Sequence, residues 1–124
     1  MLVVLAVGFG GGAGALARFG VDSLISHRAD SLFPWSTLAI NLSGCFLNGL
    51  LVALVVDALG APSWASRGLI VGFLGAYTTF STFGAETYEL TELGHWGLAV
   101  TNVALSAAAG VAAVALGQAL GRLA

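Results

Sequence analysis

Four apolar stretches, each long enough to cross a lipid bilayer as a helix, occupy almost all of this chain of 124 residues. Only 8% of the residues are charged, whereas a soluble domain has roughly 25%. A spanning helix needs about 20 apolar residues, so a chain of this length has room for four such helices and for no soluble domain. The sequence therefore predicts an all-α membrane protein with a single four-helix transmembrane domain over residues 1–124.

Short polar links separate the apolar stretches, and the expected helices cover residues 2–25, 35–59, 67–88 and 96–120. The N-terminal stretch lacks a positively charged leading region, so we expect a first spanning helix rather than a cleaved signal. Glycines in this helix recur with i,i+4 spacing, as Gly8 with Gly12 and Gly10 with Gly14. Such spacing lets another helix approach closely, and the simplest interpretation is helix packing.

The third stretch contains an unusual polar run, GFLGAYTTFSTFGAE, from Gly72 to Glu86. Four hydroxyls and two phenylalanines fall within its residues 78–83. In hydrocarbon each unsatisfied polar group costs several kcal/mol, so this run should face protein, water or an ion. Glycine and hydroxyl side chains also favour local departures from helical geometry. We therefore predict that the third helix is broken near Gly75–Thr79 and that this segment carries the function.

A break at membrane depth frees backbone carbonyls, and a buried cation is a suitable partner for them. Carbonyls from two symmetry-related breaks could hold one small ion at a dimer axis. Phe80 and Phe83 share a helical face, and the positive edges of their rings could line a path for a small anion. Packing of both rings in the core is the alternative.

In the second helix, Asn41 and Asn48 share a stripe with Thr37 and Gly44, which predicts contact with a partner helix or an aqueous path.

The charges give no preferred orientation in the membrane. With a cytoplasmic N-terminus, Arg18 and Arg28 lie outside while Arg67 and Arg122 lie inside, so the positive-inside rule is balanced. Such a chain could insert both ways and pair as an antiparallel dimer; a single orientation set by other features is the alternative. Arg18 could pair with Asp22 or snorkel, or it could raise the anion concentration at a pore mouth. The net charge of −2 argues against nucleic acid as a partner.

Three stretches together resemble the Fluc (CrcB) family of fluoride channels. They are GGGAGALARF at Gly10–Phe19, PWSTLAINLSGCFLNGLL at Pro34–Leu51, and GFLGAYTTFSTFGAET at Gly72–Thr87. The last is the most specific, because its TTFSTF core is similar to the broken third helix of that family. The fourth helix departs from the family, since it offers Asn102 and Ser106 but no tyrosine.

The resemblance implies a multi-pass protein of the cell inner membrane that exports cytoplasmic fluoride passively and lowers fluoride toxicity. It implies an antiparallel, dual-topology homodimer with one structural Na⁺ at its centre, held by backbone carbonyls of Gly75 and Thr78. The fluoride path would be lined by a small set of side chains, namely Phe80, Phe83, Asn41, Ser81 and Thr82. Arg18 would lie near the vestibule.

Two other functions fit parts of the sequence. A small proton-coupled exporter of cationic drugs needs a carboxylate within the membrane, for which Glu86 is the candidate. A non-transporting assembly subunit would explain the small-residue stripes but not the hydroxyl-rich run. An enzyme is not expected, because no cluster of His, Cys or carboxylate residues could act as nucleophile and base.

Overall fold

The computed structural model describes residues 1–27 and 31–123. Within them, four helices are long and apolar enough to cross a membrane, at Leu2–Ser26, Trp35–Ala58, Ser63–Glu92 and Trp96–Gly121. The prediction of an all-helical protein with four membrane-spanning helices is confirmed. Arg28, which the orientation argument used, lies outside the described residues.

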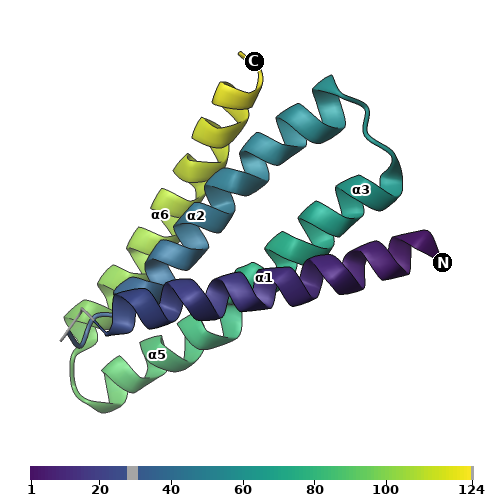
Figure 1. Ribbon diagram of the computed structural model, residues 1–124. Helices are drawn as coiled ribbons and strands as arrows, with labels where there is room; N and C mark the ends of the chain where they lie inside the picture. The colour runs from purple at the N-terminus through teal and green to yellow at the C-terminus, as the bar shows by residue number, and fades with distance from the viewer. Residues whose placement is uncertain (28–30, 124) are drawn as a thin grey trace.

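Two of the four spans consist of several helical segments (Figure 1). The first and fourth spans are the single helices α1 (Leu2–Ser26) and α6 (Trp96–Gly121). The second is α2 (Trp35–Leu51), which continues as the π-helix η1 (Val52–Ala58). The third contains α3 (Ser63–Arg67), the π-helix η2 (Gly68–Leu74), α4 (Gly75–Tyr77) and α5 (Phe80–Glu92).

The helices pack mainly as two pairs. In Figure 1, α2 and α6 run side by side, while α1 crosses the third span and packs on η2 and α4. Glycines allow the close contact between α1 and η2: a Cβ atom at Gly10 would collide with the Gly68 carbonyl, and one at Gly14 with the Phe73 carbonyl. The other predicted pair, Gly8 and Gly12, has no atom within 4 Å of such a Cβ and does not take part in this packing.

The contact between α2 and α6 is equally close. A Cβ atom at Gly49 would collide with the Val114 carbonyl, and one at Gly117 would collide with the Phe46 carbonyl. Backbones that approach this closely gain van der Waals contact, which is a main source of helix association in a membrane. The third span packs mainly on α1, and its last segment, α5, also contacts α6.

The third span extends beyond the expected range of residues 67–88 at both ends. Its helix begins at Ser63, directly after Pro62, whose fixed φ of −60° suits the residue before a helix. It ends at Glu92, and Gly94 then adopts a φ of 80°, which is accessible to glycine at little cost. Residues 89–92, expected in a link, are therefore the last turn of α5.

Candidate functional site

The third span changes its backbone conformation between α4 and α5. Thr78 has φ −76° and ψ 157°, and Thr79 has φ −145° and ψ 113°, so both are extended. The hydroxyls of Thr79 and Thr82 form hydrogen bonds at the start of α5. Thr79 Oγ1 accepts a hydrogen bond from the Thr82 N–H at 3.2 Å and donates one to Thr82 Oγ1 at 2.8 Å. Thr79 is thus the N-cap of α5, because a threonine side chain there replaces the missing carbonyl partner.

Asn41 of α2 holds the extended residue from the side. Its Nδ2 donates to the Thr79 carbonyl at 3.0 Å, and the Thr79 N–H donates to Asn41 Oδ1 at 2.8 Å. The amide side chain therefore pairs with Thr79 as a neighbouring peptide group would. Both polar backbone groups of Thr79 are satisfied in this way, which is required because Thr79 is only 6% exposed.

The same bonds leave two carbonyls without their helical partners. In a continuous helix the Thr79 N–H would bond to the Gly75 carbonyl, and the Thr82 N–H to the Thr78 carbonyl. The Thr79 N–H instead bonds to Asn41, and the Thr82 N–H bonds to Thr79 Oγ1. Gly75 is also exposed, with no atom within 4 Å of a Cβ built on it. The Gly75 and Thr78 carbonyls therefore do not receive these two helical hydrogen bonds.

A groove of about 600 Å³ runs along this segment between α2, η2 and α6. Its lining includes five of the residues selected from the sequence: Asn41, Gly75, Thr78, Phe80 and Phe83. The two phenylalanine rings have centroids 5.6 Å apart and planes inclined by 38°. The Phe80 side chain is 83% exposed. Gly44 also lines the groove, and a Cβ there would collide with the Thr78 methyl group.

Three selected residues lie outside the groove lining. Thr82 bonds to Thr79, and Ser81 Oγ lies 3.4 Å from Thr79 Oγ1, so both belong to the cap of α5. Arg18 is half-buried on α1. Within the described part of the chain, it forms no ion pair with Asp22, whose carboxylate accepts a hydrogen bond from Ser26 Oγ at 3.2 Å.

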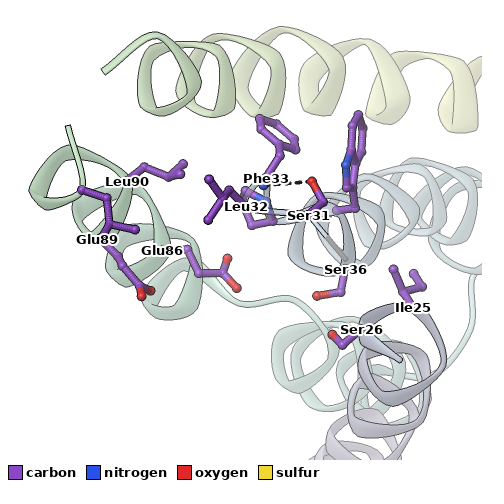
Figure 2. Close-up of a pocket in the computed structure, with 12 residues that line it drawn as sticks. Ile25, Ser26, Ser31, Leu32, Phe33, Ser36, Glu86, Glu89 and Leu90 are labelled. Carbon is purple, nitrogen blue, oxygen red and sulfur yellow. Dashed lines mark hydrogen bonds between the residues drawn. The ribbon is translucent and has the colours of Figure 1, made fainter. Parts of the chain in front are cut away.

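A second cavity, of about 340 Å³, lies where the link before α2 meets α5 (Figure 2). Figure 2 shows the Glu86 carboxylate pointing into it, with Ser36 and Ser26 on the opposite side. Glu86 Oε1 accepts a hydrogen bond from Thr37 Oγ1 at 2.9 Å. Its other oxygen, Oε2, is buried without a hydrogen-bond partner among the described residues. Among residues 1–27 and 31–123, no group of three or more His, Cys, Asp or Glu residues could hold a metal ion.

Comparison with known proteins places these features in a family. The family described as CrcB-like protein, Camphor Resistance (CrcB), matches residues 5–118. The chain belongs to this family.

Several curated relatives of this CrcB-family chain carry the name fluoride-specific ion channel FluC. The protein from Hydrogenovibrio crunogenus is 44% identical over 117 residues, covering 94% of this chain and 89% of the relative. The protein from Coxiella burnetii (strain CbuK_Q154) is 42% identical over 121 residues, covering 96% and 97%. The protein from Acidobacterium capsulatum is 45% identical over 117 residues, covering 93% and 92%.

The groove of this CrcB-family protein also contains polar residues that were not selected as site residues. Asn48 and Ser106 both line it, and so does the half-buried thiol of Cys45. Asn48 could have been selected, since it lies on the same helical stripe as Asn41. For Ser106 the signal was weaker, because a serine four residues after an asparagine in an apolar helix also fits simple packing.

Proposed function

We propose that this CrcB-family chain is a fluoride-selective passive channel and a multi-pass protein of the bacterial inner membrane. The observation that carries the proposal is the groove in which Asn41, Phe80 and Phe83 meet beside the extended pair Thr78–Thr79. The names of relatives that match nearly the whole chain support the same function. Fluoride enters a cell as neutral HF and is trapped as the anion, so an inside-negative potential would drive its export without further energy.

The lining suits a small, strongly hydrated anion. Such an ion needs hydrogen-bond donors and positive ring edges in place of its water. Asn41 uses one of its two amide hydrogens on the Thr79 carbonyl, which leaves the second for an ion in the groove. In our proposal Phe80 and Phe83 present ring edges to the ion, while Ser81 and Thr82 act through Thr79 at the start of α5. None of these side chains carries a full charge, so binding would remain weak enough for the ion to leave.

The working unit in this proposal is an antiparallel, dual-topology homodimer. The 83% exposure of Phe80 and the open position of Gly75 leave polar and aromatic groups uncovered in one protomer. Lipid cannot satisfy backbone carbonyls, whereas a second copy with an identical interrupted helix could cover them. The balanced arginines are consistent with insertion in both orientations. The interruption at Thr78–Thr79 is then the functional break of the third helix at membrane depth.

A structural Na⁺ at the dimer centre fits the oxygens that the interruption frees. The carbonyls of Gly75 and Thr78 have lost their helical partners, because the Thr79 and Thr82 amides bond elsewhere. Hard monovalent cations bind well to uncharged carbonyl oxygens of unwound helices. Two copies would contribute four such oxygens, and the ion would compensate their partial charges and join the two protomers.

Fluoride efflux from liposomes that contain the purified protein tests the proposal. A fluoride electrode follows release after addition of a K⁺ ionophore, which clamps the membrane voltage, and chloride-loaded liposomes provide the control. Rapid fluoride release without chloride release is expected. Absence of fluoride release from well-folded protein would refute the channel.

Glu86 discriminates the channel from a proton-coupled exporter. In the Glu86→Gln variant the side-chain carbonyl can still accept the bond from Thr37, but no proton can be exchanged. We therefore expect fluoride efflux to remain within about threefold of the wild type, since the side chain lies in the second cavity rather than in the groove. Loss of all transport in this variant, together with pH-driven uptake of a cationic dye by the wild type, would favour the exporter.

A further inference from the structure

The side chain of Asn102, on α6, is among the most deeply buried in the described residues, with 1% exposure. Its Nδ2 donates a hydrogen bond to Thr87 Oγ1 on α5 at 2.9 Å. Its Oδ1 accepts a longer bond from Ser106 Oγ, at 3.5 Å. A buried amide in an apolar helix is costly unless it is bonded, so the bond to Thr87 fixes how α6 meets α5.

Thr87 is also bonded to Phe83, a residue that lines the groove. Its hydroxyl donates to the Phe83 carbonyl at 2.7 Å, so its lone pairs remain to accept from Asn102. The chain of bonds therefore runs from Asn102 through Thr87 to the backbone of Phe83. Asn102 itself does not line the groove, whereas the Phe83 ring does.

Helix α5 depends strongly on such polar contacts. Leu90 is its one buried residue, so apolar packing against the other helices contributes little to holding it in place. Two polar contacts tie it to α2, from Asn41 to the capping Thr79 and from Thr37 to Glu86. Among the described residues, the bond from Asn102 is the side-chain hydrogen bond that ties α5 to α6. Without it, the side-chain hydrogen bonds that hold α5 to the other helices in the described residues would all come from α2, and its side facing α6 would lose its polar anchor.

We infer that Asn102 is a positioning residue, which sets the rotation of α5 and thereby the place of the Phe83 ring in the groove. This inference rests on the proposed function, since it assigns Asn102 to the geometry of the ion path. A ring held by a fixed helix stays at the distance that an ion requires, and a loosened helix loses that distance.

Four variants test the inference: Asn102→Leu, Thr87→Val, the two combined, and Thr101→Val as the matched control. Thr101 lies on α6, as Asn102 does. Like Thr87, it donates its hydroxyl to a carbonyl one turn back, in this case that of Gly97 at 2.8 Å, but it is exposed and has no hydrogen bond to α5. Fluoride efflux, thermal unfolding and amide hydrogen exchange are measured for each variant. The exchange measurement follows peptides that cover Phe80–Leu90 and, for comparison, peptides from α6.

Each single variant should lower fluoride efflux about tenfold, the order expected when one hydrogen-bonded contact is lost. Thr87→Val should also lower the Tm most, because it leaves the buried Asn102 amide without an acceptor. In the double variant both partners are apolar, so the Tm should return close to that of the wild type. Efflux should nevertheless stay about tenfold reduced, and exchange in α5 should stay raised, since the contact is still absent.

Recovery of efflux together with Tm in the double variant would overturn the inference, because the effect of Thr87→Val would then come only from the unpaired amide of Asn102. Unchanged exchange in α5 of Asn102→Leu would overturn it as well. The exchange measurement does not require transport. If the wild type released no fluoride, the proposed function would fail, while the exchange of α5 would still decide whether Asn102 positions this helix.

Discussion

Replacing Asn41 by leucine is expected to reduce the stability of the protein and to abolish fluoride efflux. The substitution removes both bonds to Thr79 while keeping a side chain of similar size. The buried N–H and carbonyl of Thr79 are then left unpaired, at a cost of about 1–3 kcal/mol each. The total loss of about 2–6 kcal/mol should appear as a lower Tm in detergent. Efflux should fall further than stability alone predicts, because the extended conformation beside the groove loses its support.

Asn41→Asp separates the two bonds. A carboxylate oxygen can still accept from the Thr79 N–H, but the second oxygen faces the Thr79 carbonyl and offers no donor. This variant should therefore also lose stability. Asn48→Leu, on the same helix, provides the control for the effect of asparagine removal on Tm. Equal Tm values for Asn41→Leu and Asn48→Leu would contradict the role of Asn41 as a backbone partner of Thr79.

The pairing of Asn41 with Thr79 illustrates what the sequence could not predict. The four spanning helices were predictable, because their length and apolar character follow from the thickness of the bilayer. The polar character of the segment after Gly75 was also evident, since hydroxyls in hydrocarbon need partners. Which partner each hydroxyl takes depends on contacts distant in sequence, and Asn41 and Thr79 are 38 residues apart. A single sequence contains no information on such a contact.

The hydrogen-bond partners of the hydroxyls are a second feature that the sequence did not predict. Ser81 and Thr82 were expected in the lining of the ion path, yet within the protomer they bond to Thr79 at the start of α5. Local spacing could have suggested this, because threonine three residues before a polar helix position is a common N-cap arrangement.

The glycines of α1 show the opposite case. Gly10 and Gly14 meet the backbone of η2 as expected, whereas the equally spaced Gly8 and Gly12 do not.

Replacement of Phe80 or Phe83 by isoleucine is expected to reduce fluoride efflux by about fivefold, while the protein remains folded and associated. Isoleucine retains the apolar volume but has no ring, so the positive edge that attracts an anion is lost. Each aromatic contact of this kind contributes about 1 kcal/mol, and its loss slows passage accordingly. Stability should change little at Phe80, because its side chain is 83% exposed in the protomer.

Phe9 provides a closely matched control for this experiment. Its ring is 80% exposed, almost as much as that of Phe80, but it lies on α1 and does not line the groove. Phe9→Ile should therefore leave both efflux and Tm near the wild-type values. Wild-type efflux in Phe80→Ile and also in Phe83→Ile would refute the role of ring edges in the ion path. A reduction in all three variants would indicate a general effect of surface rings on membrane insertion. A reduction confined to Phe80 and Phe83 would link the groove to fluoride, because Phe9 shares their chemistry and not their place.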